Sequence, residues 1–232
     1  MKTTTITTIA KAATLAVVAG GLALGVADPA QAATGTMYGN PTAAAQYWRY
    51  QQYDDCAIMS SADVIGQMTG KEPSERAIIK KAQSTPSKVH AGSVYIKAAD
   101  KKNPNSGNGT NILDLPTLLA QYGVQAAITD KDDAAKTGIP TGIEALEQQL
   151  SGGHKVIIFL NADMIWQQPV KDKDDDGNPR ADHAVVATGV DTANNVVHLN
   201  DSGTKTGRDE QIPMDLFLKA WATGDDLMIV TT

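Results

Sequence analysis

The side chain best suited to covalent chemistry in this chain is its single cysteine, Cys56. A lone cysteine cannot form an internal disulfide, so it is an inert buried thiol, half of an intermolecular bridge, or a reactive group. The thiolate is the form that attacks a carbonyl carbon, and the free N–H groups at a helix N-terminus stabilise that anion. Because Cys56 stands at a predicted helix start, we interpret it as a nucleophile.

The helix is predicted over residues 56–68 by apolar residues that recur at three- or four-residue intervals, namely Ile58, Ala62, Ile65 and Met68. Two acids, Asp54 and Asp55, immediately precede the cysteine and oppose its ionisation. A nearby imidazolium is therefore needed to form an ion pair with the thiolate.

Among the four histidines, His183 is the best candidate for that imidazolium and for the general base. It opens a strand predicted over residues 184–190, and the strand predicted over 195–200 ends at Asp201. The turn-like residues 191–194 join the two strands in a hairpin, so His183 and Asp201 come to corresponding ends. If the loop between the strands has an odd number of residues, the side chains of His183 and Asp201 lie on one face of the sheet. If the number is even, they lie on opposite faces unless a strand contains a bulge.

In this arrangement Asp201 orients the imidazole and stabilises its protonated form. Asn200 is an alternative for the same role. We prefer Asp201 because Val197, Leu199 and Asp201 are alternate residues and so point to the same face, which we expect to face inward. The competing interpretation is that Cys56 and His183 are both structural.

The other patterns predict an α+β domain, with helices first and an antiparallel sheet after them. Asp114 is expected to cap the helix predicted over 114–122, and Thr141 with Glu144 to form a capping box on the helix predicted over 141–150. The predicted helices are 74–83, 114–122, 141–150 and 213–221, and the remaining predicted strands are 155–160 and 227–230.

Three short motifs together resemble the C39-like group of papain-fold cysteine peptidases. They are Asp55-Cys56 at a helix start, the run from His183 to Val186, and Asp201 after the next strand. The resemblance covers about residues 47–205 and implies a papain-like cysteine peptidase fold, with N-terminal helices packed on the antiparallel sheet. It also implies amide-bond hydrolysis through an acyl-enzyme formed on a Cys-His-Asp site.

The same resemblance implies that a glutamine before the cysteine helps the cysteine N–H to hold the oxyanion. Gln52 and Gln51 are the candidates, four and five residues before Cys56, where the family typically has a spacing of about six. Ala57 stands where many members have glycine.

Residues 1–32 have the pattern of a secretory signal peptide. Lys2 and Lys11 supply the positive charge, residues 12–26 form an apolar run, and Ala30-Gln31-Ala32 fits signal peptidase. We therefore expect a secreted or cell-envelope protein, although an uncleaved anchor is the alternative. Residues 33–46 are expected to be flexible, and residues 47–232 to form one domain.

The net charge of −6 and the lack of a basic cluster argue against nucleic acid or anionic lipid as partners. We expect a peptide or protein substrate, no membrane association after signal cleavage, no cofactor and a monomer. A weak calcium-loop pattern places Asp172, Asp174 and Asp176 before Gly177, but its twelfth position falls on His183 rather than glutamate. A solvated acidic turn is the preferred interpretation, so no metal is expected.

The sequence therefore predicts a secreted cysteine peptidase or related amide-bond hydrolase. Two alternatives stay open. One is a catalytically inactive papain-fold binding module, and the other is a cell-wall amidase or acyltransferase that uses the same three residues.

Overall fold

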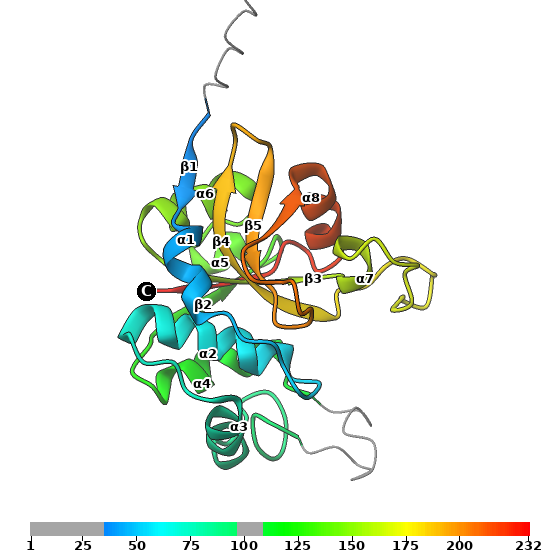
Figure 1. Ribbon diagram of the computed structural model, residues 1–232. Coiled ribbons are helices and arrows are strands. Elements are labelled where there is room, and N and C mark those ends of the chain that lie inside the picture. Colours follow the sequence, from blue (N-terminus) through cyan, green and yellow to red (C-terminus); the bar gives the residue numbers. More distant parts are fainter. Residues whose placement is uncertain (1–34, 97–108) are drawn as a thin grey trace, which may run out of the picture. The chain divides into compact units, whose positions relative to one another are not determined.

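The computed structural model describes residues 35–96 and 109–232 of the chain (Figure 1). The predicted signal peptide, residues 1–32, lies outside the described residues.

The described strands form one antiparallel sheet in the order β2-β7-β3-β4-β5-β6, and β1 pairs with β4 outside this path. Consecutive strands β3, β4, β5 and β6 are neighbours, whereas β7 returns to pair with β3. The strands are β1 (Met37–Gly39), β2 (Ala126–Thr129), β3 (Val156–Leu160), β4 (His183–Asp191), β5 (Val196–Asn200), β6 (Glu210–Pro213) and β7 (Met228–Thr231).

Helices cover both faces of this sheet. Helices α2, α3 and α4 lie on one face and α6 and α8 on the other (Figure 1). The helices are α1 (Pro41–Ala44), α2 (Cys56–Thr69), α3 (Glu75–Ser84), α4 (Leu115–Ala120), α5 (Ala134–Thr137), α6 (Ile143–Ser151), α7 (Ala162–Ile165) and α8 (Met214–Ala222), with short 3₁₀ turns at Ala45–Tyr47 and Ile112–Asp114.

The two faces of the sheet carry separate hydrophobic clusters. Along β3, Ile157 belongs to the cluster beneath α2, while its neighbour Ile158 belongs to the cluster beneath α6 and α8. Successive strand residues point to opposite faces, so a strand that is covered on both faces must be apolar throughout. This explains why β3 and β4 are continuous apolar runs in the sequence.

The expected α+β architecture with an antiparallel sheet is confirmed. The helix predicted over 56–68 is α2, and it ends at Gly70, whose φ of 73° allows the left-handed turn that closes the helix. The helices predicted over 74–83 and 213–221 correspond to α3 and α8, and the four predicted strands correspond to β3, β4, β5 and β7.

Two predicted helix caps are wrong because the side chains bind elsewhere. Asp114 makes no cap bond to α4; it is fully buried and accepts hydrogen bonds from Ser87 Oγ and Lys88 N. Thr141 donates to the carbonyl of Asp226, and the N-cap of α6 is Gly142 instead. In both cases the side chain binds a residue that is far away in the sequence, and the local sequence does not reveal such a partner.

The segment expected to be flexible, residues 33–46, is ordered where the structure describes it. Met37 to Gly39 pair with β4 as β1, and Asn40 caps the following helix α1 through Ala43 N. Three-residue strands carry too little pattern to be recognised in a run of small residues.

None of the helices within residues 35–96 and 109–232 is both long and apolar enough to cross a membrane.

Candidate functional site

Cys56 is the first residue of α2, so it lies at the helix N-terminus that the sequence predicted. Small residues let α2 lie close to β4: Ala62 is fully buried, and Ser60 Oγ donates to the carbonyl of Ala184 at 3.0 Å. This close packing brings the first residue of α2 toward the first residue of β4, which is His183.

His183 and Asp201 form a buried pair, with His183 Nε2 at 2.7 Å from Asp201 Oδ1. Their side chains are 6% and 0% exposed, respectively. Because Nε2 faces the carboxylate, Nδ1 is the nitrogen left for Cys56 on the other side of the ring. The Cys56 side chain contributes to the titration of His183 through both charge and hydrogen bonding.

A bulge in β4 makes this pairing possible. Beside the turn Val190 pairs with Val197, but farther along Ala187 pairs with Leu199, so Thr188 is an extra residue in β4. The turn between β4 and β5 contains an even number of residues, which by itself would place His183 and Asp201 on opposite faces. The bulge restores a common face.

The carboxylate of Asp201 is held by several donors. Its Oδ1 also accepts from the backbone N–H of Gly203 at 2.7 Å, and its Oδ2 accepts from Trp166 Nε1 at 2.8 Å. Burial acts to raise the pKa of Asp201, but His183, Trp166 and Gly203 outweigh it and hold the pKa below its usual value. Asp201 is therefore ionised at neutral pH.

The imidazole of His183 is held mainly in its protonated form. Burial acts to lower its pKa, but the charge of Asp201 and then that of Cys56 raise the pKa well above the usual value of 6.5. The ring also packs edge-on against Trp166, with centroids 5.2 Å apart. The arrangement can thus supply an imidazolium beside a thiol, as an ion-paired cysteine nucleophile requires.

Trp166 and Gly203 are parts of this site that sequence reasoning missed. A Cβ on Gly203 would lie 2.9 Å from both His183 Cε1 and the Trp166 ring, so only glycine fits there. A second indole, that of Trp48, donates to the carbonyl of Asp201 at 2.6 Å. The two tryptophans are far from Asp201 in the chain, and no local pattern links them to it.

Asn200, the alternative to Asp201, has different partners. Its amide nitrogen donates to Asp63 Oδ2 at 2.7 Å and to the carbonyl of Ala44 at 3.0 Å. These bonds tie β5 to α2 and α1, so Asn200 has a structural role, and among the described residues it makes no hydrogen bond to His183.

A cleft of about 380 Å³ adjoins Cys56. It lies between the start of α2, the C-terminal end of β3, the N-terminal end of β4 and residues 109–112. The described residues that line it are Asp54, Asp55, Cys56, Ala57, Gly109, Thr110, Asn111, Ile112, Phe159, Asp182 and Ala184.

The family model for the Peptidase_C39 like family matches residues 40–226 of the chain. This chain belongs to the Peptidase_C39 like family. The match covers the elements from α1 to α8 and includes Cys56, His183 and Asp201.

Two relatives show where similar chains occur. Uncharacterized proteins of Mycobacterium tuberculosis (strain H37Rv) and Mycobacterium bovis are each 66% identical over 232 residues, which is 100% of this chain and of theirs. Among solved structures, a Bacillus anthracis protein described as a C39-like peptidase has a TM-score of 0.53. It is 18% identical and the match covers 81% of this chain and 95% of that one. This likeness, together with the family match, confirms the papain-like α+β fold.

The two glutamines expected at the oxyanion position of this family differ in their surroundings. Gln51 is half-buried; its Oε1 accepts from Ser202 Oγ at 2.8 Å, and its amide nitrogen donates to the carbonyl of Tyr53. Gln52 is exposed, and its backbone N–H donates to Glu75 Oε1 at 2.6 Å. Gln51 is thus anchored next to Asp201, whereas Gln52 lies toward the start of α3.

Two carboxylates of the acidic loop at residues 172–177 bind groups that are close to them in the chain. Asp174 accepts hydrogen bonds from the backbone of Asp176 and Asn178, and Asp172 pairs with Arg180 at 2.7 Å. Asp176 is exposed. Among the described residues no group of three or more His, Cys, Asp or Glu side chains is arranged to hold a metal ion.

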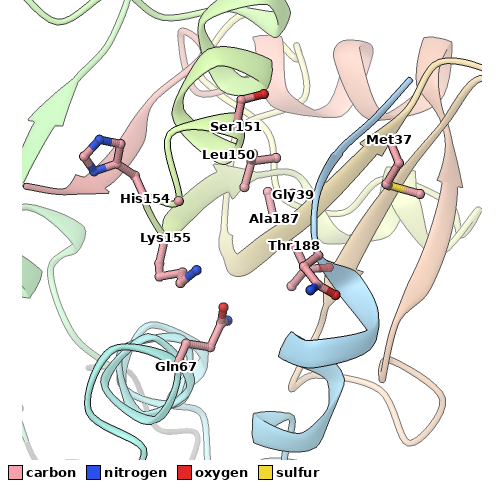
Figure 2. A pocket seen from close by; sticks show the side chains of 11 residues that line it. Met37, Gly39, Gln67, Leu150, Ser151, His154, Lys155, Ala187 and Thr188 are labelled. Carbon is pink, nitrogen blue, oxygen red and sulfur yellow. The ribbon is translucent and has the colours of Figure 1, made fainter. Parts of the chain in front are cut away.

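A second hollow, of about 400 Å³, lies beside the bulge at the other end of β4 (Figure 2). Gln67 of α2, Lys155 before β3 and Thr188 of the bulge lie around it. None of Cys56, His183 and Asp201 lines this hollow, so it is separate from the cleft beside the cysteine.

Proposed function

We propose that this protein is an exported cysteine peptidase or related amide-bond hydrolase that acts through Cys56, His183 and Asp201. The observation that carries the proposal is the buried His183–Asp201 pair, 2.7 Å apart, presented to a cysteine at a helix N-terminus. Membership of the Peptidase_C39 like family supports a peptidase-like function. The signal-peptide pattern of residues 1–32 supports export.

The reaction follows from the protonation states. The Cys56 thiolate attacks the substrate carbonyl, which forms a C–S bond and a tetrahedral oxyanion. Collapse of this intermediate breaks the C–N bond, and His183 donates its proton to the departing amine. Water then attacks the thioester and gives a proton to His183. Breakage of the C–S bond releases the acid and regenerates the ion pair.

Asp201 acts through His183 in this scheme. Its negative charge favours the imidazolium, and its hydrogen bond to Nε2 keeps Nδ1 turned toward Cys56. Trp166 and Gly203 hold the carboxylate in place, because both donate to it.

The oxyanion is stabilised by backbone N–H groups at the start of α2, including that of Cys56, and by a glutamine side chain. Gln51 suits this role better than Gln52, since it is half-buried and anchored to Ser202. Its amide nitrogen would have to leave the carbonyl of Tyr53 to reach the oxyanion.

Alkylation by iodoacetamide between about pH 5 and pH 9 tests the proposal without a known substrate. The ion pair predicts that wild-type Cys56 is alkylated rapidly below pH 7, and that His183→Ala slows this at least about tenfold. Cys56→Ala should remove both labelling and peptide cleavage. Asp201→Asn should have an intermediate effect, because it removes the charge while keeping a hydrogen-bonding group.

The matched control is a second His–Asp pair in the same sheet. His198 Nδ1 lies 2.7 Å from Asp209, and no hydrogen bond between His198 and Cys56 is found among the described residues. His198→Ala should therefore leave the alkylation rate unchanged. If wild-type Cys56 reacts slowly below pH 7 and His183→Ala changes only the stability, the protein is an inactive binding module and the enzyme proposal is wrong.

A further inference from the structure

The cleft beside Cys56 has an uneven distribution of charge. Three of its described lining residues are acids, Asp54 and Asp55 at the start of α2 and Asp182 at the start of β4. None of its described lining residues is basic. A substrate residue that enters this cleft therefore meets negative charge from two sides.

Asp55 is the distinctive member of this group. It is only 2% exposed, and among the described residues no N–H or hydroxyl group donates a hydrogen bond to its carboxylate oxygens; the group within hydrogen-bonding reach is another carboxyl, that of Glu75. Buried carboxylates are normally paired with a cation or held by N–H and O–H donors, and Asp55 in the wall of this cleft has neither among the described residues.

The groups that face Asp55 also lack a cation. Glu75 of α3, Asp54 and Tyr95 surround it, and the pKa of Asp55 is raised to about 7 by burial first, then by Glu75 and Asp54. The two carboxyl groups of Asp55 and Glu75 can hydrogen-bond to each other only by sharing a proton. A ligand cation would remove the need for that proton.

The remaining walls of the cleft suit an aliphatic stem. Phe159 and Ile112 are half-buried and apolar, while Asp54 and Asp182 are exposed at the surface. Long basic side chains bury their methylene groups against such surfaces and place the charge among acids. The volume of about 380 Å³ is within the range of small-ligand sites.

We propose that this cleft is a specificity subsite that takes a lysine- or arginine-type side chain of the substrate, next to the bond that Cys56 attacks. The inference rests on the proposed function for the position of the scissile bond. The cation is bound by the acids of the cleft: Asp54 and Asp182 attract it, and Asp55 is ionised when it arrives.

Binding can be measured without turnover in the full-length Cys56→Ala variant. The probes are two matched peptides, acetyl-Ala-Lys-Ala-amide and the same peptide with norleucine, which has a similar aliphatic chain but no charge. We expect the lysine peptide to bind at least about tenfold more tightly at low ionic strength. In calorimetry near pH 7, its binding should release protons, because Asp55 loses its proton when the cation binds.

Substitutions assign the effect to the cleft. Asp55→Asn should abolish the proton release and reduce the lysine preference, and Asp182→Asn, at an exposed position, should reduce the preference without affecting proton release. Asp132→Asn is the control, because Asp132 is exposed and does not line the cleft. It should leave both quantities unchanged.

Equal affinity for the two peptides would overturn the inference, as would a lysine preference that survives in the Asp55→Asn, Asp182→Asn double variant. These results are distinguishable from failure of the proposed function. If Cys56 alkylation shows no dependence on His183 but the lysine preference is present and depends on the two acids, the cation subsite stands and the peptidase proposal fails.

Discussion

Two buried aspartates belong to the candidate site around Cys56 and His183, and their surroundings differ in charge and in hydrogen-bond donors. Asp201 accepts hydrogen bonds from Gly203 and Trp166 and pairs with His183, and its pKa lies below the usual value. Asp55 has no such donors among the described residues, and its pKa rises to about 7. Burial raises the pKa of both carboxyl groups; the charge of His183, together with the donors, keeps Asp201 ionised, whereas the charges of Glu75 and Asp54 raise the pKa of Asp55 further.

This difference in hydrogen-bond donors gives the two buried aspartates different roles. A carboxylate surrounded by donors is a permanent charge that holds an imidazolium in place, and removing it leaves those donors without a partner. A carboxylate without donors destabilises the folded chain when it ionises, and it gains from any cation that reaches it. Substitutions at the two positions should therefore change stability in opposite directions.

The largest effect is expected at Asp201. Asp201→Ala leaves His183, Trp166 Nε1 and the Gly203 N–H without their acceptor, and breaking a buried pair in this way costs about 3–5 kcal/mol. Urea denaturation at neutral pH should show this loss. Asp209→Ala, which removes the more exposed partner of His198, is the comparison and should cost clearly less. Equal losses in the two variants would mean that the donors around Asp201 add nothing.

The opposite sign is expected at Asp55. Because its folded-state pKa is about 7 and the usual value is 3.8, its protonated form is favoured in the folded state. The associated stability is complete below about pH 3.8 and is lost as the pH rises toward 7. Asp55→Asn should therefore be more stable than wild type by up to about 4 kcal/mol at pH 8, and the difference should shrink toward pH 4.

Denaturation of both proteins at several pH values checks this expectation. Asp132→Asn serves as the control, because an exposed acid should change stability by no more than about 0.5 kcal/mol at either pH. A loss of stability in Asp55→Asn at pH 8 would show that this carboxylate has a partner after all.

A smaller effect is expected from Trp166→Phe, which removes one of the donors to Asp201 while keeping a ring against His183. Losing a hydrogen bond to a charged group costs about 1.5–3 kcal/mol, and we expect the lower end. The pKa of Asp201 should rise, and the acid limb of the stability profile should move to higher pH as a result. An unchanged acid limb would show that Trp166 does not help to keep Asp201 ionised.

The smallest effect is expected from Glu75→Gln, which acts on Asp55 from outside the cleft. Removing the charge should lower the pKa of Asp55, but the pKa should stay above 3.8 because burial is the larger cause. Carbon-detected NMR titration of the Asp55 carboxyl group measures this directly. The Gln52 N–H can still donate to the new side-chain oxygen, so the loop before Cys56 should be preserved.

The three residues proposed for the site were chosen from residue type and local position alone. The lone cysteine, the histidine at a strand start and the aspartate after the next strand each occupy a recognisable local position. The α+β order was also predictable, because β3 and β4 are apolar runs with strand length.

The supports of the site were not predictable in the same way. Trp166 reaches Asp201 across 35 residues of chain, and Gly203 is required only because His183 and Trp166 crowd the position where its Cβ would be. The lack of donors around Asp55 is a property of the packed structure as well. A pattern of residue types does not contain these distances.

The extra residue in β4, Thr188, determines how chains of this kind can be aligned. A single deletion at Thr188 would turn His183 away from Asp201, but one added residue in the turn between β4 and β5 would compensate for it. A relative with this compensated arrangement would show a gap in β4 and an insertion a few residues later. The gap and the insertion together would then preserve the pairing of His183 with Asp201. By the same reasoning, the hairpin should tolerate length changes of two residues more readily than changes of one.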